Sequence, residues 1–333
     1  MQRTIIGLDI GHSSVKVVAA SSSGRHQFIF PSVAIPAFAI SDEGEARIAA
    51  TETVTVGQRK FFVGETALVQ SCGQPPALGL TNDWIETPEH SALIAGAAKK
   101  LERLGLDLRN CLVVTGLPSA LHTHQKARMR EVVRQQIQAE VLVAPQPFGP
   151  LQTLMLTPAG TLSSAHDMRE ENWAVVEIGH FTTDFLLIQS GRIVEKASGS
   201  CGGVRLAVEH MQRLLNQENI QVDHFEAEQA LRERRIKYFG KALDVTEYAK
   251  QAISLIASEV MDTASRVLDP VARKLDGILI AGGGAPVIFP ELSLKWPHAT
   301  IANEPRMAIA EGFCRFGMSI SAKTQGAKEP AAA

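Results

Sequence analysis

Short apolar segments on either side of a polar turn occur at the start of the chain and again near its middle. The β-branched run Thr4–Ile10 ends at Gly11, and Val15–Ala20 resumes the same pattern, which predicts a hairpin with a tight turn. Trp173–Ile178 and Phe185–Ile188 repeat this arrangement around a second polar turn. Two such units in one chain suggest duplicated halves.

The rest of the chain alternates between helical and extended patterns. We expect helices over Ser91–Leu104, Gln125–Gln138, Leu151–Leu156, Val204–Asn216, Phe225–Arg235, Val245–Leu268 and Arg306–Phe316. We expect strands over Gln27–Phe38, Ala46–Val63, Leu112–Thr115 and Gly277–Ala281. The polar stretch Thr157–Asn172 is typical of a surface loop, and the mixture of elements indicates an α/β protein.

Length and a proline-rich segment indicate two domains. The chain has 333 residues, of which 45% are hydrophobic, whereas a single core stops growing at roughly 250–300 residues. Pro145–Pro150 contains three prolines and a glycine, which favours a crossing between domains. We therefore expect one domain over residues 1–146, a second over 147–304 and a disordered tail over 319–333.

Composition limits the binding partners and the cellular compartment that we expect for the protein. A formal net charge of −2 gives no overall attraction to DNA or anionic membranes, so a link to DNA would need a local patch or an adaptor protein. The four cysteines lie far apart without a CxxC pair, which favours free thiols in a reducing compartment. The first apolar run is too short for a signal peptide, and no stretch approaches the ~20 apolar residues of a spanning helix. We expect a cytoplasmic protein.

The first polar turn carries groups that suit a metal-bound polyphosphate. Backbone amides in a tight turn can contact phosphate oxygens where a residue such as Gly11 leaves them accessible. Asp9, at the end of the strand, can hold Mg²⁺ through water, and Lys16 supplies a positive charge. For this turn alone, an ordinary hairpin with a solvated acid and lysine fits the residues equally well.

The second polar turn repeats the acid-x-glycine arrangement. Glu177 and Gly179 take the places of the aspartate and the glycine, and hydroxyl side chains follow from Thr182. Two such turns, one in each domain, could hold a triphosphate between them and share one metal ion. The matched pair is stronger evidence for phosphate binding than either turn alone.

A triple glycine follows the predicted strand Gly277–Ala281. Gly282, Gly283 and Gly284 would let the backbone approach a flat ligand such as a purine or its ribose, before a helix opens at Ala285. A flexible connection is the simpler alternative. Three consecutive glycines cost conformational entropy, so we favour ligand binding.

Together these segments resemble the phosphate-1, phosphate-2 and adenosine motifs of the superfamily that contains actin, DnaK-type chaperones and sugar kinases. Within it, the chain is most similar to the ParM (StbA) family of plasmid-segregation actins, through GLDIGHSSVK, FVGETA, VVTGLP, EIGHFTTD, GSCGGVR, LIAGGGA and MAIAEGF. The resemblance implies the actin-like ATPase fold, in which two RNase H-like domains flank a nucleotide cleft. It also implies a C-terminal helix over 305–318 that packs back on the first domain, and ATP or GTP bound with Mg²⁺.

The resemblance assigns roles in catalysis to three residues. Asp9 matches the aspartate that orders the metal, Lys16 the lysine that contacts phosphate, and Gln146 the glutamine that orients the attacking water. Because an amide is no strong base, the role of Gln146 would be positioning, although a hinge residue bonded to backbone is the alternative. Glu177 occupies the second metal position, where the family usually has aspartate. Its extra methylene moves the carboxylate by roughly one carbon–carbon bond, and because a misplacement of about 1 Å can be costly, we expect slow hydrolysis.

The remaining residues of the motifs would bind the nucleotide. The resemblance implies contacts with the phosphates and sugar from Gly11, Ser13, Ser14, Lys16, Gly179, Thr182, Gly202 and Gly203, and with the base side from Gly282, Gly283, Gly284 and Ala285. His12 and His180 could also bond a phosphate, although a histidine in a turn is more often simply solvated.

The expected function is a nucleotide hydrolase that assembles head to tail into filaments, which are open because the interface is heterologous. The resemblance implies plasmid segregation through an adaptor bound to a centromere, with DNA held only indirectly and no membrane partner. Two alternatives stay open. One is a nucleotide-binding scaffold of cell-division or pilus type with weak hydrolysis, and the other is a small-molecule kinase on the same fold.

Overall fold

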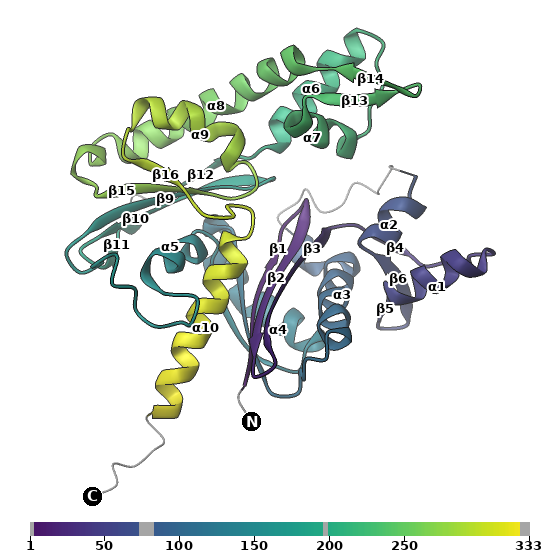
Figure 1. The fold of residues 1–333 in the computed structure, drawn as a ribbon, viewed down its shortest axis with the longest axis horizontal. Coiled ribbons are helices and arrows are strands. Elements are labelled where there is room, and N and C mark those ends of the chain that lie inside the picture. The colour runs from purple at the N-terminus through teal and green to yellow at the C-terminus, as the bar shows by residue number, and fades with distance from the viewer. Residues whose placement is uncertain (1–2, 73–82, 196–198, 327–333) are drawn as a thin grey trace, which may run out of the picture. The chain divides into compact units, whose positions relative to one another are not determined.

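The computed structural model describes residues 3–72, 83–195 and 199–326, and its contacts divide the chain into two compact units (Figure 1). Unit 1 contains the residues up to Ser71, those from 83 to Met168 and those from Met307 to 326. Unit 2 contains Arg169–Arg306 and, from the earlier part of the chain, Cys72. None of the helices in these described residues is long and apolar enough to cross a membrane.

Unit 1 is built on a five-stranded sheet in the order β3-β2-β1-β7-β8. The strands are β1 (Thr4–Ile10), β2 (Ser14–Ser21), β3 (Gly24–Pro31), β7 (Cys111–Leu117) and β8 (Glu140–Pro145). The first three are antiparallel, whereas β7 and β8 run parallel to β1. Every residue of β1 is buried, as expected for a strand whose sheet is covered on both faces.

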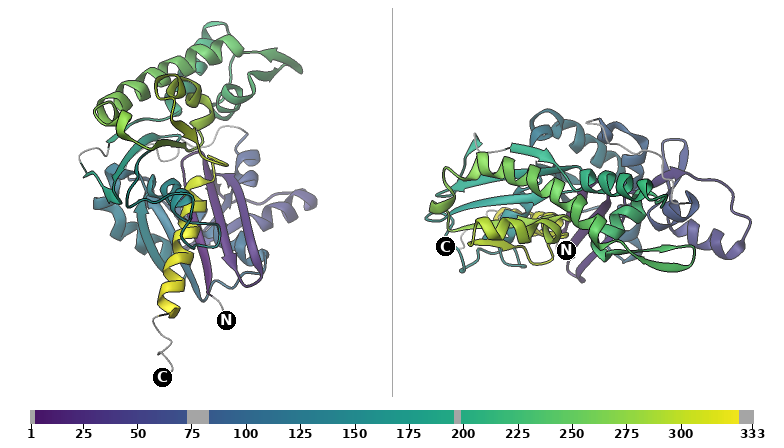
Figure 2. Two further views of the ribbon diagram at one scale, coloured as in Figure 1. Left: turned by 60° about the vertical axis from the view of Figure 1, so that its left-hand side comes forward. Right: turned by 90° about the horizontal axis from the view of Figure 1, so that it is seen from above.

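Helices cover both faces of this sheet (Figures 1 and 2). On one face, α3 (Pro88–Arg103) and α4 (Ser119–Gln136) pack over a core that includes Ile6 and Leu8 of β1. On the other face, α10 (Ala308–Gly326) packs over Ile5 of β1. This alternation follows from the two-residue period of a strand.

A smaller three-stranded sheet in the order β4-β6-β5 completes unit 1. Its elements and the nearby helices are β4 (Ala34–Pro36), α1 (Glu43–Thr51), β5 (Thr53–Val56), β6 (Arg59–Val63), α2 (Glu65–Gln70) and η1 (Trp84–Glu86). The prediction of extended chain over the whole of Ala46–Val63 was wrong. The first part of this range belongs to α1. Asp42 is the N-cap of this helix and stabilises its start, because its side chain accepts a hydrogen bond from the Glu45 amide.

Helix α10 packs backbone against backbone on both β1 and α5 (Phe148–Met155). A Cβ on Gly7 would lie 2.0 Å from the carbonyl oxygen of Ala310, and one on Gly312 would lie 1.7 Å from that of Gly149. Because α5 packs on α10, residues 147–168 lie in unit 1, and the boundary falls after residue 168 and not after residue 146 as expected. The helix also continues to Gly326, past the expected start of the tail at 319, whereas 327–333 lie outside the described residues.

Unit 2 repeats the sheet topology of unit 1. The strands β11 (Arg192–Ile193), β10 (Thr182–Gln189), β9 (Asn172–Ile178), β15 (Gly277–Ala281) and β16 (Ala299–Ile301) lie in that order, and β12 (Gly199–Gly202) also pairs with β10. Again the first three strands along the chain, here β9, β10 and β11, are antiparallel, and β15 and β16 run parallel to β9. This repeat confirms the duplication predicted from the two hairpins.

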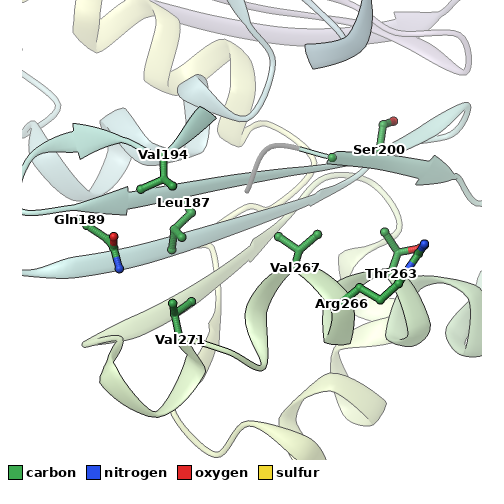
Figure 3. Close-up of a pocket in the computed structure, with 9 residues that line it drawn as sticks. Leu187, Gln189, Val194, Ser200, Thr263, Arg266, Val267 and Val271 are labelled. Atoms are coloured by element: carbon green, nitrogen blue, oxygen red, sulfur yellow. The ribbon is translucent and has the colours of Figure 1, made fainter. Parts of the chain in front are cut away.

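The core of unit 2 lies between its sheet and four helices. These are α6 (Arg205–Gln217), α7 (His224–Glu233), α8 (Thr246–Leu268) and α9 (Ala285–Lys295). The hairpin β13 (Arg235–Tyr238) and β14 (Lys241–Asp244) connects α7 to α8, and the short η3 (Ala272–Lys274) lies between α8 and β15. A cavity of about 410 Å³ opens between α8 and the end of β10, lined by Leu187, Val194 and Val267 among others (Figure 3). Its lining runs from Gln189 at the end of β10 to Ser200 of β12, which pairs with Asp184.

Candidate functional site

The two polar turns share one backbone design. In unit 1 the Gly11 amide donates a hydrogen bond to the Ser14 carbonyl at 3.2 Å, and in unit 2 the Gly179 amide donates to the Thr182 carbonyl at 2.9 Å. Each turn therefore reverses the chain over three residues between paired strands. The amides and carbonyls of both turns occupy the same positions relative to their strands.

A following segment supports the first turn. The carbonyl of Ser13 accepts a hydrogen bond from the Ser32 amide at 3.1 Å, and the Ser32 hydroxyl donates to the Gly11 carbonyl. Ser14 is buried where β2 begins. These bonds hold the turn in one conformation, which is the property that an anion site made of backbone amides needs.

Asp9, Lys16 and Gln146 meet beside this turn. The Lys16 Nζ donates to Asp9 Oδ2 at 3.0 Å, and the Gln146 Nε2 donates to Asp9 Oδ1 at 3.3 Å. The Asp9 side chain is only 2% exposed. Two glycines make room for its partners, since a Cβ on Gly11 would lie 2.8 Å from Lys16 Nζ and one on Gly116 would lie 3.2 Å from Gln146 Cγ. The structure thus brings together the three residues singled out in this half of the chain.

His12 packs against an aromatic side chain. Its ring stacks on Trp84 with centroids 4.2 Å apart, and Trp84 forms a T-shaped pair with the buried His90 of α3, with centroids 4.8 Å apart. Burial, and to a lesser extent the proximity of His12, lowers the pKa of His90 to about 3. His90 is therefore neutral at physiological pH, and the layer of three rings supports the first turn from α3.

The second turn carries two buried carboxylates. Glu177 of β9 lies directly opposite Asp184 of β10, and Thr182 donates its hydroxyl hydrogen to Asp184 Oδ2 at 2.8 Å. In unit 1 the corresponding pair is Asp9 and Lys16. An acid therefore stands in unit 2 where unit 1 has a lysine, so this turn favours a cation more strongly. Asp184 was not among the predicted site residues, although aligning the two turns from the sequence places it opposite Lys16.

The triple glycine packs against the second turn. Gly282 adopts a φ of +93°, and a Cβ there would lie 2.5 Å from Glu177 Oε1 and 2.3 Å from the Ile178 carbonyl oxygen. A Cβ on Gly284 would also collide with Ile178, whereas one on Gly283 would meet only Cγ of Arg306, at 4.0 Å. Two of the three glycines are thus needed for packing, and the first of them leaves room for the longer side chain of glutamate at 177.

The amides of Gly202 and Gly203 are engaged within unit 2. Gly203 donates to the Phe181 carbonyl at 3.0 Å, and Gly202 donates to Glu259 Oε1 at 2.9 Å. The sequence predicted that these two amides would contact a bound anion, whereas in the structure both donate hydrogen bonds to protein acceptors. The bond from Gly203 holds the second turn in place. Ala285 is fully buried at the start of α9.

His180, at the second turn, lies against α7. Its Nε2 is 3.2 Å from Nε2 of His224, and its Nδ1 is 3.8 Å from Oε2 of Glu228. The histidine expected to contact phosphate is therefore held beside two other potential metal ligands.

The two halves of the chain match models of two actin-like domain families. The N-terminal domain of actin-like proteins matches residues 7–149, and the C-terminal domain of the MreB-like archaeal actin homologues matches residues 175–294. The chain is an actin-like protein. The match confirms the superfamily resemblance found in the motifs. No curated protein matches this actin-like chain by sequence.

Solved structures share this actin-like fold over nearly the whole chain. A 15-stranded ParM filament from Clostridium botulinum has a TM-score of 0.74 at 19% identity, and the match covers 95% of this chain and 99% of that one. The archaeal actin homologue Ta0583 in complex with ADP has a TM-score of 0.68 at 18% identity and covers 97% and 100%. MreB5 of Spiroplasma citri bound to ADP has a TM-score of 0.64 at 17% identity and covers 97% and 98%. The expected fold is thereby confirmed.

Proposed function

We propose that this actin-like protein binds ATP or GTP with Mg²⁺ through its two polar turns, hydrolyses it slowly and assembles into filaments. The observation that carries the proposal is the cluster of Asp9, Lys16 and Gln146 beside a rigid turn. A metal-ordering acid, a phosphate-binding cation and a water-positioning amide are what phosphoryl transfer to water requires. Two of the structures with the same fold are complexes with ADP, which supports a nucleotide as the ligand.

In unit 1, each side chain of the cluster has a separate task. Asp9 would hold water molecules of the Mg²⁺ shell, because magnesium keeps most of its waters when it binds a protein. Lys16 would contact the phosphates. The amide of Gln146 donates to Asp9, and its amide oxygen would accept a hydrogen bond from the attacking water and orient it. His12, Ser13 and the neighbouring amides would line the phosphates.

In unit 2, the two acids of the second turn are the candidates for holding metal-bound water. Glu177 and Asp184 add negative charge where Mg²⁺ waters can be held. The turn from Gly179 to Thr182 would contact the phosphates, and Gly283, which is exposed, would allow the ribose or base to approach. Glutamate at 177 favours slow turnover, because a shift of about 1 Å in a catalytic group lowers the rate strongly.

Assembly into filaments is supported by the likeness to a ParM filament structure. A head-to-tail contact is heterologous, so it continues without closing and produces a polymer. We further propose that the filament moves plasmid DNA through an adaptor protein bound at a centromere. A formal net charge of −2 agrees with DNA being held only indirectly.

The metal site is tested with Asp9→Asn, which keeps the shape of the side chain but removes its charge. We expect phosphate release to fall by about a hundredfold, because a neutral amide orders metal-bound water poorly. Asp262→Asn on the exposed surface of α8 is the control and should leave the rate unchanged. Equal rates in wild type and Asp9→Asn would remove Asp9 from the site.

Assembly is tested by light scattering and electron microscopy with ATP, GTP, a non-hydrolysable analogue and no nucleotide. We expect filaments with a nucleoside triphosphate and loss of scattering as it is hydrolysed. Filaments that persist without phosphate release would favour the scaffold alternative, which the glutamate at 177 specifically suggests. Absence of nucleotide-dependent assembly at high protein concentration would refute the filament proposal.

A further inference from the structure

Three metal-ligating side chains converge on one side of the second turn. His180, His224 and Glu228 each offer one ligand atom, and these atoms all lie within 4.8 Å of one another. His180 comes from the turn between β9 and β10, whereas His224 and Glu228 come from α7. Residues four apart in a helix lie on the same face, so α7 presents its histidine and its carboxylate together.

The distance between the two imidazoles suits a shared metal ion. Nε2 of His180 lies 3.2 Å from Nε2 of His224. Two histidine nitrogens bound to one tetrahedral zinc, each at about 2.0–2.1 Å, lie about 3.3 Å apart. The ring nitrogens therefore already stand at the separation that a single Zn²⁺ would impose.

Glu228 is oriented toward the histidines by a salt bridge. Its Oε1 accepts a hydrogen bond from Arg232 Nη1 at 3.0 Å, and its Oε2 lies 3.8 Å from Nδ1 of His180, the ring nitrogen other than the one beside His224, so the carboxylate or the ring has to rotate before both can bind one ion. That second separation is too long for a hydrogen bond. The side chains of His180 and Glu228 are only 9% and 8% exposed. A partner that fixes a ligand from behind is typical of metal sites, because it prevents the carboxylate from rotating away.

The start of α7 holds its two ligands in place. Asp223 forms a capping box with Glu226, in which each side chain accepts a hydrogen bond from the other residue's amide. His224 is the first residue of the helix, directly after this cap. A rigid helix end presents the ligands with little loss of conformational freedom on binding, which strengthens a metal site.

We propose that His180, His224 and Glu228 bind one Zn²⁺, with water as the fourth ligand. Two histidines and a glutamate are a donor set that zinc uses in proteins when one position remains open to water. The ion would cross-link the second turn to α7 and so limit the movement of the turn. This site lies wholly within unit 2 and does not depend on nucleotide binding.

Metal binding is measured directly on untagged full-length protein stripped with EDTA. Titration with Co²⁺ is followed by its visible absorption, and bound Zn²⁺ is counted by atomic absorption after dialysis. We expect one ion per chain in wild type and at least a hundredfold weaker binding in His224→Ala. His210→Ala on the neighbouring α6 is the matched control and should bind like wild type. Zinc at a hundredfold excess over its dissociation constant should raise the Tm of wild type by about 5 °C.

Further variants test whether the carboxylate binds the ion and whether an exposed thiol contributes to binding. Glu228→Gln keeps the shape of the ligand and should weaken binding at least tenfold. Cys72→Ser, which removes the exposed thiol, should bind like wild type. Circular dichroism checks that each variant is folded. Less than a tenth of an ion per wild-type chain, or equal affinity in folded His224→Ala and His210→Ala, would overturn the proposal. Because no nucleotide is present, either outcome leaves the nucleotide proposal standing, and Asp9→Asn should bind zinc normally.

Discussion

His90 should make the stability of this protein depend on pH below neutrality. The residue is 1% exposed in α3, where its ring forms a T-shaped pair with Trp84. Burial lowers its pKa from 6.5 to about 3, and the nearby His12 contributes in the same direction. A buried imidazole of this kind resists protonation until the protein unfolds.

The size of the effect follows from the two pKa values. Above pH 6.5 His90 is neutral in both states and contributes no pH dependence. Below 6.5 the unfolded chain takes up a proton that the folded chain does not, so the free energy of unfolding falls as pH falls, until about pH 3. At about 1.36 kcal/mol per pKa unit, acidification to pH 5 lowers it by about 2 kcal/mol through this residue alone.

Urea unfolding at about pH 7.5 and pH 5, followed by circular dichroism, measures the effect. His90→Leu has a similar volume and cannot titrate, so it should lose about 2 kcal/mol less than wild type between the two pH values. His124→Leu, at an exposed position of α4, is the control and should behave like wild type. If wild type and His90→Leu lose the same free energy on acidification, the reasoning from burial is refuted.

Three other substitutions test packing and the charge cluster. Gly312→Ala places a methyl group 1.7 Å from the Gly149 carbonyl oxygen, so it should lower the free energy of unfolding by about 3 kcal/mol in a urea titration. Lys16→Met leaves the carboxylate of Asp9 buried without its cation, so it should lower the free energy of unfolding by about 3 kcal/mol. The same substitution should weaken ATP binding at least tenfold in a fluorescence titration. Gly282→Ala forces a Cβ onto a backbone oxygen of the second turn at a φ of +93°, so a loss of about 3 kcal/mol is expected by calorimetry, and an unchanged Tm would contradict the close packing described above.

The features that sequence predicted best are the local ones. Both hairpins, the central strand Gly277–Ala281 and the long helix that ends at Leu268 were recognised because their patterns are set by neighbours along the chain. Asp9 and Lys16 could be paired from the sequence, since a hairpin places residues on either side of a tight turn opposite each other.

The features that sequence missed depend on contacts between distant segments. The boundary after residue 168 follows from the approach of Gly149 to Gly312, which no local pattern reports. The packing of Gly282 and Gly284 on β9 likewise joins segments that are distant in the sequence. The cluster that includes His180 requires the turn and α7 to meet in space, and forty-odd residues separate them in the sequence.

The position of α10 has a consequence for the order in which the protein forms during synthesis. Gly7 of β1 lies against the backbone of Ala310, so one face of β1 is covered only after α10 has been synthesised. Unit 2, encoded between them, has its own continuous sequence from Arg169 to Arg306 and can close its core while the ribosome still holds α10. Unit 1, which contains the first strand to be translated, therefore completes its core last.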